Sequence, residues 1–308
     1  MLAASVCLVI AGVATVAQDQ GRGNAGGRGR GRANAAPDPV KKAVQIKPNL
    51  WFIADGGANS VVDVTPEGLI LADTKNPGAE IETALIAEIA SISPLPVKYL
   101  FNTHPHGDHF SHNQYFIDHG ATVIGLTHMK DVWEASNLKD TPGKPTVLFD
   151  KDYVLKFGGT EVEAHYFGSA HTDADVYVFF KSRKFVMVSD LVNFAAASPG
   201  ISGANAVQVP GILERLLKLD FDTAIAGRGP LLTRADIQTY QKTWDTFMTR
   251  VKDAVKAGAT KETLASQVKQ DDLFSPGLTA PWSFNANFFG QLFDALKSNP
   301  NGEPRFSN

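Results

Sequence analysis

The chain has 308 residues, of which 44% are hydrophobic, and its formal net charge is −3. This length and composition suffice for one large or two small domains with a substantial buried core. The small net charge argues against a general affinity for nucleic acid or for an anionic membrane surface. We therefore expect a small-molecule substrate and no nucleic-acid partner.

Residues 1–17 are predicted to be a signal peptide. They carry no charged side chain, and the small residues Thr15 and Ala17 precede a suitable cleavage position before Gln18. The segment is shorter than the about 20 apolar residues that span a bilayer, so we expect cleavage and no stable membrane insertion afterwards. This predicts a secreted or periplasmic protein. No basic residue follows Met1 within the segment, which leaves an uncleaved anchor as the alternative.

Residues 18–43 are predicted to form a flexible linker, and residues 44–308 the folded domain. The linker is rich in Gly, Arg, Ala and Asn, and it has too little apolar surface to offset the entropy of ordering. The only cysteine, Cys7, lies in the predicted signal peptide. The mature chain then has no thiol, so any metal site must use histidine and carboxylate ligands.

The first half of the domain alternates short strands with helices. Strands are predicted at residues 50–54, 60–64 and 68–72, with turn residues between them. Asn76 and Pro77 then suit the N-cap and the first turn of a helix that Pro94 ends. Further along we expect a strand at 96–103, a helix at 110–119, a strand at 122–125 and a helix at 127–137.

The second half has the same character. Thr233 is expected to cap a long helix, with Asp236 in the position that completes a capping box. The other predicted elements are strands at 153–157, 161–167, 175–180, 185–188 and 223–226 and helices at 207–219, 261–270 and 284–296. Two strand-rich halves, each with its own helices, predict an α/β protein in which two sheets pack face to face with helices outside.

A cluster of histidines follows the predicted strand at 96–103. Four of the eight histidines, His104, His106, His109 and His112, lie close together in the sequence. Core packing does not require such a density, because unpaired buried imidazoles are costly. Alternate residues of an extended segment face one side, so His104 and His106 can converge on one ion, with Asp108 and His109 turned toward a neighbouring position. This donor set suits Zn²⁺, although iron or manganese also fits.

In these residues the sequence resembles the metallo-β-lactamase superfamily, over roughly residues 45–230. The family's His-x-His-x-Asp-His loop matches the run from His104 to His109. A later single histidine matches His171, and an aspartate after another strand matches Asp190. The resemblance implies an αββα four-layer sandwich with two mixed sheets and helices outside.

The resemblance also implies a metal-ligand set. His104, His106 and His171 would form a first metal site, while Asp108 and His109 would form a second, with Asp190 bridging the two. Asp73 resembles the aspartate of the family's early strand, and we expect it to orient a ligand histidine through the ring N–H; a carboxylate that caps a turn is the alternative. His112 lies one helical turn after His109, so we expect it behind the ligands or at the surface.

One position departs from the family pattern. The family usually ends its ligand set with a histidine in a Gly-His-Gly-type turn, but this chain has Arg228 there and no histidine beyond His171. Arginine stays protonated and offers no lone pair to a metal. Either Asp108, His109 and Asp190 hold a second metal weakly, or the Arg228 guanidinium pairs with Asp108 or Asp190 and leaves one metal. Charge repulsion favours one tightly bound zinc with an uncertain second; Arg228 pointing into solvent is a third alternative.

The implied activity is that of a zinc-dependent hydrolase. Bound zinc would lower the pKa of a water molecule to about 7. Asp108 would orient that water and accept its proton, and Arg228 would help to stabilise the oxyanion. Lactams, lactones, esters and thioesters suit this scheme, and phosphoesters would need two metals.

Three other functions remain open. A β-lactamase proper is one, although no basic residue closely follows Asp190 to bind a carboxylate. A catalytically silent metal-binding or partner-binding domain and an iron-dependent oxidoreductase are the others, because the fold hosts all of them. The substrate-binding residues are not identified: residues 193–206 and the aromatic residues Trp282, Phe284 and Phe288 are candidates, although such aromatics more often pack in a core.

Overall fold

The computed structural model describes residues 38–192, 200–274 and 284–304. The predicted signal peptide, most of the predicted linker, residues 193–199 and Trp282 lie outside this part. The last residues assigned to the linker already contact the folded body. The Gly56 N–H donates to the Asp38 carbonyl at 2.9 Å, and the Lys41 N–H donates to the Ala54 carbonyl at 3.0 Å. The described fold therefore starts before residue 44.

The first sheet has seven strands in the order of the chain, from β1 to β7. The pairs from β1 to β4 are antiparallel, and those from β4 to β7 are parallel. Its strands are β1 (Val44–Lys47), β2 (Leu50–Ile53), β3 (Ser60–Thr65), β4 (Gly68–Ala72), β5 (Val97–Phe101), β6 (Thr122–Leu126) and β7 (Val147–Phe149). The sequence prediction missed β1 and β7, the two edge strands, because so few residues show no clear alternation.

The second sheet has six strands in the order β13-β12-β11-β10-β9-β8. Only β11 and β12 pair in parallel. Its strands are β8 (Asp152–Phe157), β9 (Thr160–His165), β10 (Tyr177–Phe180), β11 (Phe185–Met187), β12 (Thr223–Ile225) and β13 (Leu231–Thr233). The short edge strand β13 was also missed.

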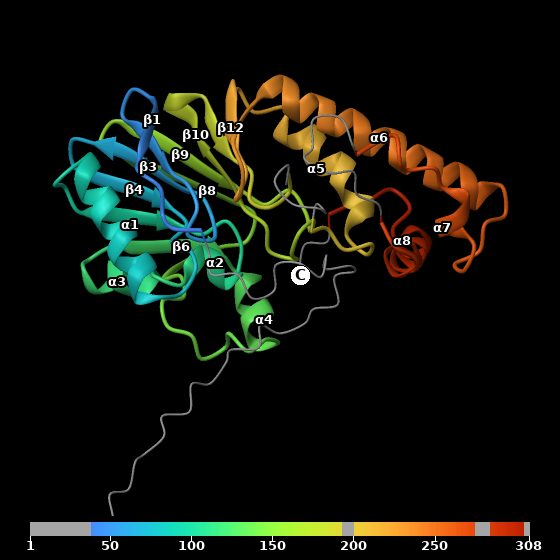
Figure 1. The fold of residues 1–308 in the computed structure, drawn as a ribbon, viewed down its shortest axis with the longest axis horizontal. Helices are drawn as coiled ribbons and strands as arrows, with labels where there is room; N and C mark the ends of the chain where they lie inside the picture. The colour runs from blue at the N-terminus through green and yellow to red at the C-terminus, as the bar shows by residue number, and fades with distance from the viewer. Residues whose placement is uncertain (1–37, 193–199, 275–283, 305–308) are drawn as a thin grey trace, which may run out of the picture.

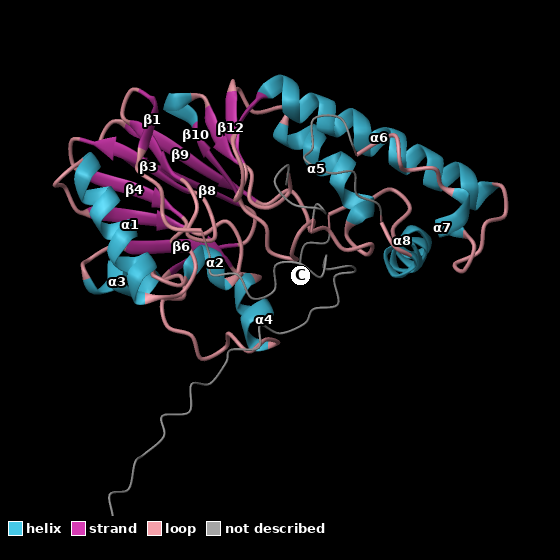
Figure 2. Ribbon diagram, viewed as in Figure 1, coloured by secondary structure: helices cyan, strands magenta, loops and turns pink. Residues whose placement is uncertain are grey.

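Both sheets are mixed, and apolar side chains fill the space between them. Val61, Ile70 and Phe101 of the first sheet pack with Val178 and Met187 of the second in one buried cluster. Helices cover the outer faces, as Figures 1 and 2 show. The predicted four-layer αββα sandwich is confirmed.

The outer layers follow from the apolar stripes of the helices. Leu85 and Ile89 of α1 and Phe116 of α3 pack on the first sheet, while Ile212 of α5 and Ile237 of α6 pack on the second. The helices are α1 (Ala79–Ile92), α2 (Gly107–Phe110), α3 (Asn113–Asp118), α4 (Met129–Glu134), α5 (Val209–Leu216), α6 (Arg234–Lys256), α7 (Leu264–Gln267) and α8 (Ala286–Ser298), with 3₁₀ turns η1 (Lys181–Arg183) and η2 (Ala206–Gln208). None of these helices has both the length and the apolar character needed to cross a membrane.

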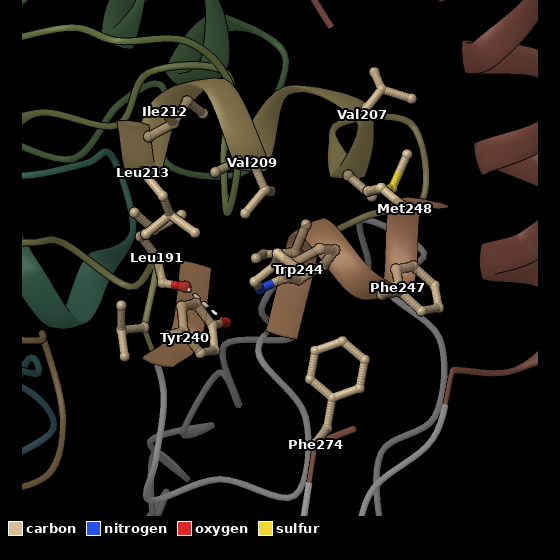
Figure 3. Packing of buried hydrophobic residues seen from close by; sticks show 14 of the residues in the cluster. Leu191, Val207, Val209, Ile212, Leu213, Tyr240, Trp244, Phe247, Met248 and Phe274 are labelled. Carbon is tan, nitrogen blue, oxygen red and sulfur yellow. Dashed lines mark hydrogen bonds between the residues drawn. The ribbon is translucent and has the colours of Figure 1, made fainter. Parts of the chain in front are cut away.

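Helices α5 to α8 gather at one side of the sandwich around an aromatic core. Figure 3 shows Trp244 and Phe247 of α6 facing Phe274, and the Tyr240 hydroxyl donating to the Leu191 carbonyl at 3.1 Å. Phe284 and Phe288 stack on each other in the same cluster, with ring centroids 3.6 Å apart. Their candidacy as pocket walls is therefore wrong, and the ordinary packing role applies.

Three predicted helices differ from the observed ones. The first begins at Ala79 rather than after Asn76, whose N–H donates to the Gly56 carbonyl and whose carbonyl accepts from His112. The helix expected at 110–119 splits into α2 and α3, because the His112 N–H donates to the Thr74 hydroxyl instead of continuing the helical ladder. The helix expected at 261–270 is the single turn α7. The capping box of Thr233 and Asp236 is present.

Candidate metal centre

The predicted site residues lie at one edge of the sandwich, in loops that follow the strands. Asp73 follows β4, and His104 lies beyond the end of β5, which is parallel to β4. Asp190 and Arg228 follow β11 and β12, which are also parallel. Parallel strands present their carboxyl ends at the same edge. His171 lies in the loop that joins the antiparallel strands β9 and β10, and this loop is at the same edge.

Three imidazoles converge on one point. The His104 Nε2 lies 3.1 Å from the His106 Nδ1, which lies 3.0 Å from the His171 Nε2. These rings come from loops of both sheets, and each pair stands nearly perpendicular. Among the described residues, these three histidines form one of the two groups spaced for a metal ion.

The Nδ1 atoms of His171 and His104 point away from the cluster and have hydrogen-bond partners of their own. The Gly200 carbonyl can only accept, so the His171 Nδ1 donates to it at 2.9 Å, and the His171 Nε2 is the atom that faces His106. The His104 Nδ1 lies 3.1 Å from the Ser189 hydroxyl. Burial, followed by the nearby His109 and His106, holds the pKa of His104 well below its usual range. Convergent imidazole nitrogens of this kind are a donor set that fits a metal ion such as Zn²⁺.

Asp73 holds His109 from behind, as predicted. The His109 Nδ1 donates to the Asp73 Oδ2 at 2.6 Å, and both atoms are buried. Asp73 is itself fixed by the Thr103 N–H and hydroxyl, at 2.8 and 2.6 Å. Burial lowers the pKa of His109, but the charge and hydrogen bond of Asp73 outweigh it, so the net shift is upward.

Two buried atoms at the same place have no hydrogen-bond partner in the described structure. They are the His109 Nε2 and the Asp190 Oδ1, which lie 3.8 Å apart. With His104 they make the second group spaced for an ion. The Asp190 Oδ2 lies 3.6 Å from the His171 Nε2, so the carboxylate borders both groups. Orphaned polar atoms are costly to bury, and a cation between them removes that cost; the residues therefore fit a metal.

Arg228 lies between the two carboxylates of the cluster. Its Nη1 donates to the Asp190 Oδ2 at 2.5 Å, its Nη2 donates to the Asp108 Oδ2, and its Nε donates to the Gly57 carbonyl at 3.0 Å. Of the three arrangements expected from the sequence, the structure has the guanidinium paired with aspartate, and with both Asp108 and Asp190. The side chain still exposes 39% of its surface.

The turn that carries Arg228 is held from the opposite sheet by Asn59. The Asn59 N–H donates to the Gly227 carbonyl at 2.7 Å, and its side-chain amide donates to the Ala226 and Gly229 carbonyls at 2.9 and 3.0 Å. At Gly227 a Cβ atom would lie 2.1 Å from the Asp190 Oδ1, so only glycine fits there. Sequence reasoning missed Asn59, because nothing in its local pattern indicates a contact with a distant turn.

A buried lysine anchors the loop that contains Asn59. The Lys75 Nζ donates to the carbonyls of Ile53, Asp55 and Ala58 at 2.6–2.8 Å. Burial lowers the pKa of Lys75 to about 7, although Asp55 and Asp73 oppose the shift. The sequence prediction also missed Lys75, since its position just after Asp73 resembles an ordinary polar turn.

The loop of His171 is organised by Asp175. The Asp175 carboxylate is fully buried and accepts hydrogen bonds from the backbone N–H groups of Ala170, His171 and Thr172, at 2.8 to 3.2 Å. These contacts fix the backbone from which the His171 ring projects. A carboxylate soon after a candidate ligand is the signal that would have identified it.

His112 does not contact the proposed ligands through its ring. Its Nε2 donates to the Asn76 carbonyl at 2.6 Å, and its Nδ1 lies 3.1 Å from a carboxylate oxygen of Glu82. Both ring nitrogens are thus engaged at the start of α1, and the position of His112 behind a metal ligand stays a prediction. Its backbone N–H instead donates to Thr74, whose hydroxyl approaches the His109 carbonyl at 3.4 Å.

Known proteins resemble this chain in sequence or in fold. The 2,4-dinitroanisole O-demethylase subunit alpha of Nocardioides sp. (strain JS1661) is 21% identical over 241 residues, which are 75% of this chain and 71% of that protein. A metallo-beta-lactamase from Pontibacter korlensis superposes with a TM-score of 0.58 at 19% identity, over 67% of this chain and 99% of its own. A stereoselective inverting sec-alkylsulfatase from Pseudomonas sp. gives a TM-score of 0.68 at 15% identity; the match covers 84% of this chain but about half, 51%, of the sulfatase.

At these identities the two solved structures show a common fold alone. The family assignment comes from the sequence pattern of the metallo-beta-lactamase superfamily, which matches residues 49–228. This stretch covers more than half of the chain and extends from the first strands to Arg228. The resemblance found in the sequence is thereby confirmed: the chain belongs to the metallo-beta-lactamase superfamily.

Proposed function

We propose that the protein is a zinc-dependent hydrolase that cleaves a small carbonyl compound such as a lactam, lactone, ester or thioester. The observation that carries this proposal is the convergence of three imidazoles: the His106 Nδ1 lies 3.1 Å from the His104 Nε2 and 3.0 Å from the His171 Nε2. His104, His106 and His171 would hold the ion, and Asp190 lies close enough to be a fourth ligand. Zinc bound there supplies a Lewis acid that makes water a stronger nucleophile at neutral pH.

The chain's own residues have separate tasks in this proposal. Asp108 lies at the exposed side of the cluster, where its carboxylate can orient a water molecule and accept its proton. Arg228 keeps its positive charge beside the same position, and its partly exposed guanidinium can stabilise negative charge that develops on a carbonyl oxygen. Asp73 holds the orientation of the His109 ring.

We further propose a single tightly bound ion. The guanidinium already places a positive charge between Asp108 and Asp190, which lowers the gain from adding a second dication there. The unpaired His109 Nε2 and Asp190 Oδ1 then face the occupied position or a weakly bound second ion.

The decisive experiment combines metal analysis with turnover. His106→Ala removes a central ligand, so the variant should lose zinc and all hydrolysis of chromogenic esters, lactones and cephalosporins. His119→Ala is the matched control, because His119 is exposed and bonds only to its own helix through the Tyr115 carbonyl. Zinc content is measured by elemental analysis of both variants. Turnover that persists in the metal-free His106→Ala protein would contradict the proposal.

The alternatives give different results in the same measurements. Hydrolysis of cephalosporins ahead of other substrates would indicate a β-lactamase proper. Zinc without turnover on a broad panel would indicate a silent binding domain, and iron in place of zinc would indicate an oxidoreductase.

A further inference from the structure

A cavity of about 600 Å³ lies between the loop that contains His171 and helix α8. Ser169 and Asp173 of its wall stand two residues before and after His171. Asn205, which also lines the cavity, donates from its side-chain amide to the Ala170 carbonyl at 3.3 Å and to the Asp173 Oδ1 at 3.2 Å. The cavity and the proposed zinc ligand are therefore built on the same loop.

A second connection runs through helix α4. His128, which lines the cavity, is the residue just before this helix. The Trp133 indole N–H of the same helix donates to the Pro105 carbonyl at 2.9 Å, between His104 and His106. Two walls of the cavity are thus fixed to loops that carry the proposed ligands.

The lining has more apolar than polar surface, and its charged side chains include two carboxylates. Asp173 and Asp294 contribute carboxylates, and none of the described residues that line the cavity is a lysine or an arginine. Asp173 is exposed, whereas Asp294 forms an ion pair with Lys261. The Tyr166 hydroxyl, 3.1 Å from the Ser169 hydroxyl, adds a neutral hydrogen-bonding group. Burial raises the pKa of Tyr166, and the charges of Asp175 and Asp173 raise it further, as expected where the local potential is negative.

These features exclude several classes of ligand. A carboxylate, sulfate or phosphate group would be repelled by Asp173 and would find no lysine or arginine among the described lining residues. An uncharged polar group can use the hydroxyls and amides, and a positive charge gains in addition from the carboxylate. The charge of the cavity thus discriminates between substrates of equal size.

We propose that this cavity binds the part of the substrate that is not cleaved, and that the class it fits is an acyl compound bearing an ammonium group. Its role as a substrate site rests on the proposed hydrolase function, whereas its preference for cations does not. The exposed carboxylate of Asp173 is the main determinant of that preference.

Binding without turnover tests the cavity itself. The metal-free protein is labelled with ¹⁵N and titrated with n-butylammonium and, separately, with n-butyrate. The ammonium should shift the amide signals of Ser169 and Asn205, and butyrate should not. Asp173→Asn should weaken ammonium binding by about fivefold, the upper range for an exposed ion pair. Asp118→Asn is the matched control, because Asp118 is an exposed carboxylate of α3 that does not line the cavity.

Turnover tests the role in catalysis. The zinc-loaded protein is given p-nitrophenyl esters of hexanoic acid, of its 6-trimethylammonio derivative and of adipic acid. We expect kcat/KM to be highest for the cation and lowest for the anion, and Asp173→Asn to lower it only for the cation. Equal effects of Asp173→Asn and Asp118→Asn, or butyrate binding at Ser169, would overturn the proposal. Ammonium binding without hydrolysis of any ester would support the cavity and contradict the hydrolase.

Discussion

At the scale of single residues, position 228 has the largest chemical consequence. Its guanidinium donates to one oxygen of Asp108 and to one oxygen of Asp190. These are the two carboxylates that a second metal would need. A positive side chain there satisfies charges that would otherwise need an ion, and it leaves the three-histidine group intact.

Arg228→His should therefore raise the zinc content of the protein. The variant removes the positive charge between the carboxylates and offers an imidazole lone pair in its place, so we expect the stoichiometry to rise from one zinc per chain toward two. Metal analysis after dialysis against a weak chelator measures this. Arg234→His is the control, since the Arg234 guanidinium bonds backbone carbonyls of the loop before β12. An unchanged zinc content would argue that the vacancy left by Arg228 is not a metal position.

The residues of the site differ in how far the sequence revealed them. His104, His106 and Asp108 share one short segment, and that spacing alone is specific. Asp73 and Asp190 were found through the order of the family pattern. Asn59 and Lys75 were missed because they act on backbone carbonyls of distant turns, and such contacts depend on the tertiary fold rather than on any local motif.

At the scale of elements, the loop between β2 and β3 depends on Lys75. Its Nζ binds the carbonyls of Asp55 and Ala58 in this loop and that of Ile53 at the end of β2, and Asn59 at the end of the loop reaches the Arg228 turn. The loop thus gains its shape from a side chain that lies outside it. Buried carbonyl groups in such a loop need hydrogen-bond donors, and Lys75 supplies them.

Lys75→Met keeps the length of the side chain but removes all three donors, so we expect a loss of about 3 kcal/mol in the free energy of unfolding. The pKa of Lys75 is lowered to about 7 in the folded protein, against about 10.4 in an unfolded chain. The unfolded state then binds more protons between these values, so the contribution of Lys75 to stability rises as the pH increases from 7 to about 10.

Urea unfolding of the wild type and of Lys75→Met at pH 7 and pH 9 measures both effects. The difference between the two proteins should be larger at pH 9. Lys130→Met, at an exposed position of α4, is expected to have no such effect. A difference that shrinks with rising pH would show that the folded protein keeps Lys75 charged throughout this range.

The longer helices and strands were predicted well from the sequence. The missed edge strands and the shifted start of α1 have physical causes. The long helix α6 and the central strands carry clear apolar periodicity. The edge strands β1, β7 and β13 have too few residues for it, and the start of α1 shifts because Asn76 bonds the Gly56 backbone instead of capping the helix. Tertiary hydrogen bonds overrode local preference in that case.

At the scale of the whole molecule, the proposed ligands come from both sheets. His104 and His106 follow β5 of the first sheet, whereas His171 and Asp190 belong to loops of the second. An ion held by all of them links the two halves of the sandwich. Metal binding should therefore contribute to global stability as well as to catalysis.

Removing the metal should lower the melting temperature. At a free zinc concentration 100 times Kd, binding stabilises the folded state by about 2.7 kcal/mol, which corresponds to about 5–10 °C for a domain of this size. Calorimetry with zinc and with a chelator measures the shift, and His106→Ala should show none. A wild-type protein that melts at the same temperature with and without zinc would contradict a link between the sheets through the ion.

The grip of Asn59 on the Ala226–Gly229 backbone has a consequence for how the protein responds to change. This asparagine precedes β3, while the turn it holds follows β12, so a slight sliding of one sheet over the other would drag the guanidinium away from its aspartates. The contacts of Arg228 with Asp108 and Asp190 therefore depend on how the two sheets are aligned. We therefore expect that substitutions in the interface between the sheets, far from any histidine, change the activity at a smaller structural disturbance than the one needed to unfold the protein.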